Sequence, residues 1–164
     1  MEECHAAGNR FIPAGRPRDE GRPRVDSAPA CRQCSRTGAG VPLSKPVVMD
    51  THPELGQDAG LETMCETIRR AVAAAKLTMA DVAAIGVATP GLMDIKAGLI
   101  LDPPNLKPWK NVPVRDHIAK KFGKPTAFQN DANAAAYGEF WVGAASAAKS
   151  MVLFTLGTGV GGGI

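Results

Sequence analysis

An amide and a carboxylate stand side by side at Asn130 and Asp131, just before an alanine-rich stretch. Such a pair at a strand-to-helix turn can bind a polyol, because the amide orients one hydroxyl group while the carboxylate accepts the proton of another. Asp131 alone is more simply explained as the N-cap of the following helix, since aspartate is a strong N-cap. Together the two side chains favour a site for a hydroxylated small molecule.

A glycine-rich segment, LGTGVGGGI, follows the last apolar run and occupies Leu156 to Ile164. Its five glycines could leave backbone N–H groups accessible to a phosphate. Part of it fits G-x-G-x-x-G, but the dinucleotide-binding fingerprint needs a helix after it, and a Walker loop needs Gly-Lys-Ser/Thr. A tight hairpin that requires glycine is the competing interpretation.

Asn105 lies in the proline-braced segment PPNLKPW, where an Asx-turn is an equally good explanation. Trp109, in the same segment, is expected to cover the core rather than stack on a ligand. The loop is therefore a candidate binding element only in combination with the others.

Cys31 and Cys34 have the C-x-x-C spacing of half a zinc site. A structural zinc needs four ligands, and only Cys4 and His5 lie nearby, at a spacing that fits no zinc motif. We therefore expect two reduced thiols rather than a metal site.

Hydrophobic periodicity predicts the elements that carry these residues. Apolar residues at helical spacing predict a first helix from about residue 58, and a helix cap is expected at Thr78. The predicted elements after it are a strand at 85–88 that breaks at Pro90-Gly91, a hairpin at 92–101, a helix at 114–123 with Gly123 as its C-cap, a strand at 126–128, a helix from 130–131 to 143 and a strand at 150–156.

Strands that alternate with helices indicate an α/β fold with at least some parallel pairing. Ligand sites in such folds gather where strands end. The three candidate loops all follow predicted strands: Thr89-Pro90-Gly91, Asn130-Asp131 and Gly157-Thr158-Gly159.

The beginning of the chain differs in composition from the rest. Residues 1–57 are rich in proline, glycine and arginine and are predicted to form a disordered basic arm. The net charge of +3 is too small to argue for nucleic acid. Without a signal peptide or a long apolar run we expect no membrane association and a cytoplasmic location.

Three segments, VATPGLMDIKAGLILDPPNLKPWKNVPV, QNDANAAAYGEFWVGAA and VLFTLGTGVGGGI, together resemble the ROK family of sugar kinases, above all its bacterial glucokinases. The resemblance covers residues 58–164, and the combination is far more specific than any one segment. It implies part of the N-terminal lobe of an actin-like, ribonuclease-H-like α/β fold, whose two lobes bind ATP and sugar between them.

The resemblance also implies an activity: transfer of the γ-phosphoryl group of ATP, with Mg²⁺, to a hexose. Glucose is the default, and fructose, mannose and N-acetylmannosamine stay open. The roles that it implies are Asp131 as catalytic base, Asn105 and Asn130 as sugar ligands, Gly91 as a backbone contact to the sugar, and Gly157, Thr158 and Gly159 as a phosphate loop.

Two parts of the family pattern do not match. Residues 1–57 contain no Asp-x-Gly-Gly-Thr phosphate loop, and the cysteine cluster that binds the family's structural zinc has no counterpart. We therefore expect residues 1–57 to be foreign to the family, by frameshift or otherwise, and the chain to be truncated, with little kinase activity of its own. A homo-oligomer is possible in the full-length parent.

Two other functions are weighed against the kinase. A non-enzymatic, sugar-sensing ROK transcriptional regulator would need a helix-turn-helix, and the proline-rich residues 1–57 argue against one. An RNA-binding role for the basic arm would need interleaved aromatic residues, which this arm lacks. Asp131 favours catalysis over the regulator.

Overall fold

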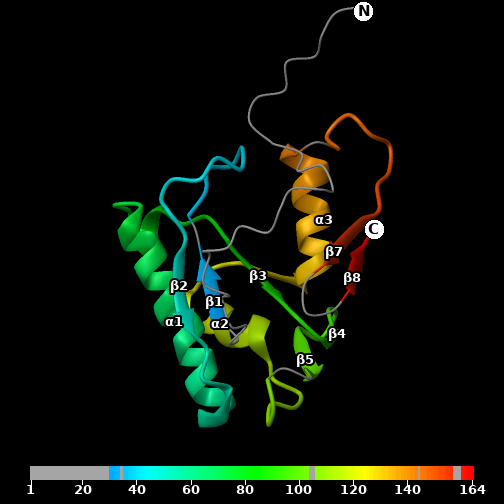
Figure 1. Cartoon of the computed structure of the whole chain (residues 1–164). Helices are drawn as coiled ribbons and strands as arrows, with labels where there is room; N and C mark the ends of the chain where they lie inside the picture. Colours follow the sequence, from blue (N-terminus) through cyan, green and yellow to red (C-terminus); the bar gives the residue numbers. More distant parts are fainter. Residues whose placement is uncertain (1–29, 34, 104–105, 144, 157–159) are drawn as a thin grey trace, which may run out of the picture.

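The computed structural model of the chain describes residues 30–33, 35–103, 106–143, 145–156 and 160–164. The helices are α1 (Gln57–Ala74), α2 (Val114–Phe122) and α3 (Asp131–Val142), with 3-10 turns η1 (Pro53–Leu55) and η2 (Met79–Asp81) (Figure 1). The strands are β1 (Ala30–Gln33), β2 (Val47–Asp50), β3 (Ile85–Thr89), β4 (Leu92–Asp94), β5 (Leu99–Asp102), β6 (Thr126–Asn130), β7 (Leu153–Leu156) and β8 (Val160–Gly163).

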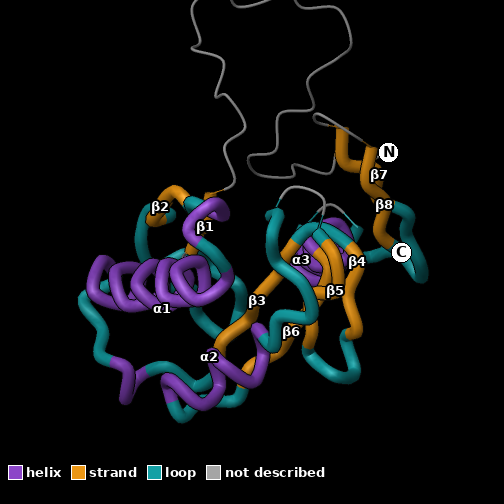
Figure 2. The backbone as a smooth tube through the Cα atoms, turned by 90° about the horizontal axis from the view of Figure 1, so that it is seen from below, coloured by secondary structure: helices purple, strands orange, loops and turns teal. Residues whose placement is uncertain are grey.

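The predicted parallel pairing is present at the centre of the molecule. β3 and β6 pair in parallel, with Val87 opposite Phe128 and Thr89 opposite Asn130. The helices α1 and α2 lie on one side of this pair and α3 on the other (Figures 1 and 2). Alternate residues of β3 are buried, because the side of α1 and α2 is closely packed while the side of α3 leaves Gly86 and Ala88 exposed. The remaining strands form antiparallel pairs: β1 with β2, β4 with β5, and β7 with β8.

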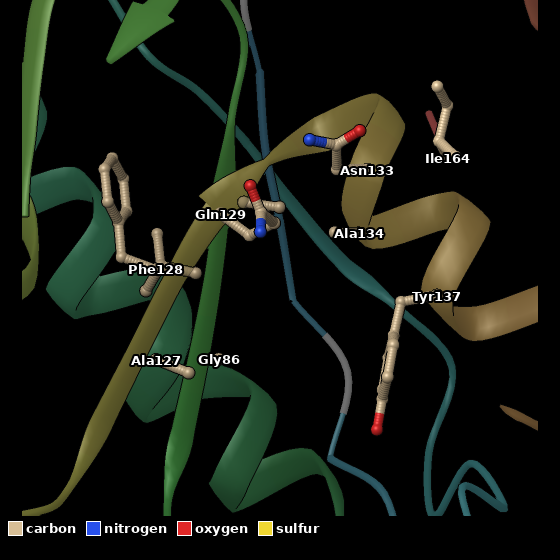
Figure 3. A pocket seen from close by; sticks show the side chains of 10 residues that line it. Gly86, Ala127, Phe128, Gln129, Asn133, Ala134, Tyr137 and Ile164 are labelled. Atoms are coloured by element: carbon tan, nitrogen blue, oxygen red, sulfur yellow. The ribbon is translucent and has the colours of Figure 1, made fainter. Parts of the chain in front are cut away.

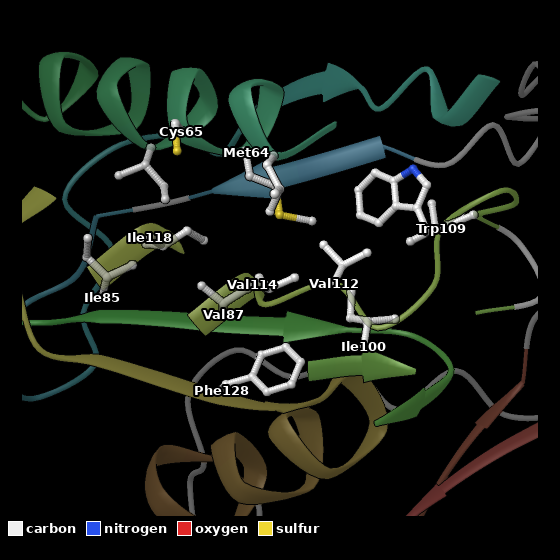
Figure 4. Packing of buried hydrophobic residues seen from close by; sticks show 13 residues of the cluster. Met64, Cys65, Ile85, Val87, Ile100, Trp109, Val112, Val114, Ile118 and Phe128 are labelled. Carbon is white, nitrogen blue, oxygen red and sulfur yellow. The ribbon is translucent and has the colours of Figure 1, made fainter. Parts of the chain in front are cut away.

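The core lies between α1, α2 and the inner face of β3 and β6 (Figure 4). The apolar stripe of the first helix is confirmed, since Leu61, Met64 and Ile68 are buried there. Trp109 packs so closely on α1 that a Cβ at Gly60 would overlap its indole ring. The most deeply buried side chains of this core include Cys65, Ile100, Trp109, Val112, Val114 and Ile118.

The predicted hairpin of β4 and β5 is held against the start of α2 by one side chain. The guanidinium of Arg115 donates hydrogen bonds to the carbonyl oxygens of Lys96 at 3.0 Å and Ala97 at 3.2 Å. Gly98, at φ 77°, lies against the same arginine. The turn and the start of the helix therefore form one unit. At the other end of α2, the predicted glycine cap is confirmed, since Gly123 follows the helix with φ 61°.

Structure begins earlier in the chain than the sequence predicts. Residues 30–57 include two paired strands and a 3-10 turn, so the part of the predicted arm that the structure describes has regular structure. The strands β1 and β2 pack against α1, and the Ser35 hydroxyl donates to the Ala71 carbonyl at 3.1 Å. The predicted disorder is wrong for these residues because contacts with α1, rather than a local pattern, hold them.

The β7–β8 hairpin packs against α3 at the opposite side of the molecule from α1 (Figure 1). Gly163 lies against the first turns of the helix: an added Cβ would come within 2.5 Å of the Ala132 carbonyl oxygen and 2.9 Å of the Ala136 Cβ. Among the described helices, none has both the length and the apolar character needed to span a membrane.

Candidate functional site

The carboxyl ends of β3 and β6 bring two of the three candidate loops to one edge of the sheet. Thr89 and Asn130 are register partners, so the residues that follow them leave the sheet side by side. Gly91 turns the chain after β3 with φ 90°, a backbone conformation that favours glycine. Asp131 follows β6 directly and is exposed. The predicted backbone contact and the predicted base thus share one edge.

Asn130, and not Asp131, is the N-cap of α3. The Asn130 Oδ1 accepts hydrogen bonds from the backbone N–H groups of Ala132 at 3.0 Å and Asn133 at 3.3 Å. Asp131 is the first helical residue, and its Oδ1 accepts from the Ala132 N–H at 2.9 Å. The expectation that Asp131 is the N-cap is therefore wrong, and the preceding residue, Asn130, has this role.

This cap determines what the turn can offer to a ligand. The Asn130 Oδ1 already accepts hydrogen bonds from the helix backbone. The Nδ2 amino group is therefore the part of the amide that would contact a ligand, as a donor to one of its hydroxyl groups. The Asp131 carboxylate supplies acceptor atoms one residue later. A donor and an acceptor in adjacent positions match two neighbouring hydroxyl groups of a polyol.

The third candidate loop, at 157–159, lies outside the described residues, but the strands on both sides of it are described. Gly161 of β8 lies beside Ala132, whose Cβ would be 3.5 Å from a Cβ added to the glycine. The hairpin that carries the loop therefore contacts α3 one residue after Asp131. A strand rather than a helix follows the loop, which excludes the dinucleotide-binding fingerprint and agrees with the hairpin interpretation.

Gly161, Gly162 and Gly163 have a different role from the one expected of phosphate-binding glycines. They belong to β8, which pairs with β7, and the small size of Gly163 permits the close approach to α3. The sequence cannot distinguish a glycine that binds phosphate from one that permits close packing, because both roles require a residue without a side chain.

Asn105 also lies outside the described residues, and its predicted role stays a prediction. The loop around it is anchored on both sides, since Pro103 and Leu106 are buried. The Leu106 N–H donates to the Pro103 carbonyl at 3.2 Å, and backbone hydrogen bonds between Ile100 and Val112 close the base of the loop. The core thus fixes where this loop begins and ends.

Sequence reasoning passed over Thr89 as a candidate side chain. It is only 2% exposed, and its Oγ1 has no hydrogen-bond partner among the described residues. A buried hydroxyl without a partner is unfavourable, so it calls for an explanation. A threonine directly before Pro90-Gly91, at the end of an otherwise apolar strand, is the signal that could have identified it.

A groove of about 590 Å³ lies on the other face of the strand pair, between β3, β6 and α3 (Figure 3). Small residues such as Gly86 and Ala127 form the strand side, while Asn133 and Tyr137 of α3 face them. None of the predicted site residues that the structure describes, Gly91, Asn130 and Asp131, lines it. The groove and the strand-end turn are therefore distinct features of the described structure.

The perturbed ionisable groups lie away from this edge. Burial raises the pKa of the Cys65 thiol, which disfavours the thiolate and makes a nucleophilic role unsuitable. Hydrogen bonds from Lys121 and Arg69 lower the pKa of Glu62 on α1. No group of three potential metal-binding side chains occurs in the part of the chain described here; Cys34 lies outside it.

Comparison with known proteins gives one consistent family. The sequence profile described as ROK family matches residues 46–164, starting earlier than the resemblance noted from the sequence alone. A glucokinase from Thermotoga maritima is 37% identical over 125 residues, which are 74% of this chain and 37% of the relative. A xylose repressor from Caldicellulosiruptor bescii is 34% identical over 68% of this chain and 28% of the repressor.

Solved structures agree with these relatives. The crystal structure of a ROK family glucokinase from Streptomyces griseus in complex with glucose and AMPPNP matches with a TM-score of 0.67 and 32% identity, covering 81% of this chain and 40% of that chain. The mixed α/β fold is therefore that of the actin-like ROK sugar kinases. The chain spans less than half the length of the relatives that it matches.

Proposed function

Because the chain belongs to the ROK family, we propose that it supplies the sugar side of an enzyme that transfers the γ-phosphoryl group of ATP to a hexose, with glucose as the first substrate to test. The observation that supports this most is the strand-end turn. It presents an amide donor at Asn130, a carboxylate at Asp131 and a positive-φ glycine at Gly91 along one edge.

In the proposed reaction, Asp131 acts on the attacking hydroxyl group. The hexose oxygen forms a bond to the γ-phosphorus, the bond between that phosphorus and the β,γ-bridging oxygen breaks, and ADP leaves with the electron pair. The proton of the hydroxyl passes to the Asp131 carboxylate. The carboxylate is exposed at the beginning of a helix and can reach a ligand there.

The Asn130 amide orients the sugar so that one hydroxyl faces Asp131. Phosphoryl transfer depends mainly on positioning and electrostatic stabilisation, so this orientation is the main contribution that the described residues make. The co-substrate is ATP with its Mg²⁺, and we propose that residues 157–159 contact its phosphates. The described residues contain no group of three or more His, Cys, Asp or Glu side chains that could hold the metal by themselves.

Asn105 is proposed as a second sugar ligand, because its loop leaves the core at Pro103 and returns at Leu106. Whether the chain alone completes a catalytic cycle is a separate question from whether it binds the sugar. We propose that hexose binding is measurable and that phosphoryl transfer by these residues alone is slow, since the matched segment covers only 37% of the Thermotoga maritima relative that is named glucokinase.

Calorimetric titration of glucose into the chain tests the proposal. Asn130→Asp keeps an oxygen for the α3 cap but removes the amide donors, so it should weaken glucose binding without unfolding the helix. Asn130→Ala removes both and serves as the comparison for a lost cap. Unchanged glucose affinity in Asn130→Asp would contradict the assignment of the amide to the sugar.

A second function, sugar sensing without catalysis, is favoured by the likeness to a xylose repressor. The two functions differ in what Asp131 does. For an enzyme, Asp131→Asn removes the proton acceptor and should abolish Mg²⁺-ATP-dependent formation of hexose phosphate while sugar binding persists. For a sensor, no hexose phosphate forms with either residue at position 131, even at high chain concentration and long incubation.

A further inference from the structure

Thr89 is a polar residue in a position that would otherwise suit an aliphatic one. β3 buries Ile85, Val87 and Thr89 in alternation, and all three lie on the face that packs toward the core. Valine has nearly the same shape as threonine and no hydroxyl to satisfy. The threonine hydroxyl is thus an unfavourable feature of the core unless it has a use.

The register of the sheet shows which side chain is closest to this hydroxyl in the ladder. Thr89 is the partner of Asn130, and in a parallel ladder register partners project on the same face. Asn130 is only half-buried, so it lies at the boundary between the core and the site. A side chain on this face at the end of β3 therefore neighbours the Asn130 amide.

Among the described residues, the side-chain hydrogen bonds of Asn130 involve its oxygen and leave its amino group available. Its Oδ1 is occupied by the N–H groups of Ala132 and Asn133. The amino group carries two N–H donors, of which a ligand hydroxyl can use one. The hydroxyl of Thr89 is an acceptor with no partner among the described residues. The unused donor and the unused acceptor are complementary.

We infer that Thr89 is a positioning residue of the sugar site, whose hydroxyl accepts one N–H of the Asn130 carboxamide when a hexose accepts the other. The inference rests on the proposed hexose site. It explains why an unpartnered hydroxyl is kept in the core: in the free chain it is unfavourable, and in the hexose-bound chain it fixes the plane of the amide that orients the sugar.

Two substitutions separate this role from a merely structural one. Thr89→Val keeps the shape and removes the hydroxyl, so the free chain should melt about 2–4 °C higher, because an unsatisfied polar group is lost. The same variant should bind glucose about 3- to 10-fold more weakly, because a hydrogen bond of the bound state is lost. Stability and affinity thus move in opposite directions.

Thr89→Ser is the matched control. It keeps the hydroxyl and removes a methyl group from the core, so its melting temperature should fall while its glucose affinity stays close to that of the unaltered chain. A structural role alone would make the two properties follow each other in both variants.

The outcomes distinguish the inference from the function on which it rests. A lower melting temperature in Thr89→Val means that the hydroxyl is already hydrogen-bonded in the free chain and overturns the inference. Equal glucose affinity in Thr89→Val also overturns it, while the hexose site survives. If the unaltered chain binds no glucose in the same titration, the hexose site fails and the inference falls with it.

Discussion

The two sides of the central strand pair differ sharply in how well their apolar residues are covered. On the side of α1 and α2, Trp109 and Ile118 are almost completely buried. On the side of α3 and the β7–β8 hairpin, Trp141 is 49% exposed, Phe154 71% and Leu156 82%. One chain therefore contains a closed core and an open apolar face.

This difference shows what hydrophobic patterning predicts and what it leaves open. α1 is amphipathic, with one apolar stripe and ion pairs on its outer face, and that stripe is buried as expected. α3 is apolar around much of its circumference but buries only Ala132 and Ala136. A helix of the second kind is normally surrounded by protein. Its exposure marks the less stable side of the molecule.

The two tryptophans give the most direct comparison of the two sides and the largest expected effect. Trp109→Ala should lower the free energy of unfolding by about 3–5 kcal/mol, because it leaves a cavity against Gly60 in the core. Trp141→Ala should cost less than about 1 kcal/mol, since this side chain is half exposed and its ring pairs loosely with that of Tyr137, with centroids 6.4 Å apart. Urea unfolding followed by circular dichroism measures both, and similar losses would refute the distinction.

Substitutions at two neighbouring glycines of β8 test how the hairpin packs on the open side. Gly163→Ala should destabilise the hairpin by about 1–3 kcal/mol, because the new Cβ meets the backbone of α3. Gly162→Ala is the control, since among the described residues its Cβ would meet only the Leu153 carbonyl oxygen, at 3.9 Å. Hydrogen exchange of the β7 and β8 amides should accelerate in the first variant alone. Equal exchange in the two would mean that the hairpin does not pack on α3 as described.

On the closed side, Arg115 is expected to matter more than an exposed arginine. Arg115→Lys removes the fork of hydrogen bonds to the Lys96 and Ala97 carbonyls and should cost about 1 kcal/mol. Arg70→Lys, in an exposed pair with Glu66, should cost no more than about 0.5 kcal/mol. Thermal melts of the two variants give this comparison, and a larger loss at Arg70 would reverse it.

The smallest effect expected is a pH dependence from the outer face of α1. Hydrogen bonds from Lys121 and Arg69 lower the pKa of Glu62, and hydrogen bonds from Arg70 and Arg69 lower that of Glu66. A lowered pKa in the folded chain gives stability above the unfolded value of about 4.3, which is lost as the pH falls through the folded value. In the double variant Glu62→Gln/Glu66→Gln, the melting temperature should fall slightly less steeply as the pH is lowered below that value. A fall as steep as that of the unaltered chain would count against these pairs.

Much of the fold could be predicted from local patterns. The helical stripe of α1, the glycine cap of α2 and the break of β3 at Pro90-Gly91 are confirmed, because each has a local physical cause. β1 and β2 could not be predicted, since contacts with α1 stabilise them. β8 was not among the predicted strands, because a run of glycines carries no strand signal, although a hairpin was one of the two interpretations of this segment.

The candidate site was predicted in part. The sequence placed Gly91 and Asn130-Asp131 at strand ends, and the parallel register confirms that they share an edge. It could not assign the cap to Asn130 instead of Asp131, because both residue types cap helices well. Nor could it reveal that the Thr89 hydroxyl has no hydrogen-bond partner among the described residues, which depends on tertiary packing. Asn105 and residues 157–159 stay predictions.

The central claim is that the strand-end turn, and not the groove between the strands and α3, binds the hexose. The most direct measurement is the change in ¹H–¹⁵N resonances of the chain as glucose is added. We predict that the Asn130 side-chain amide and the Gly91 backbone amide shift with a common saturation curve, while the side-chain amide of Asn133 moves little. Shifts concentrated at Gly86 and Asn133 in the groove, with Asn130 and Gly91 unchanged, would contradict the account.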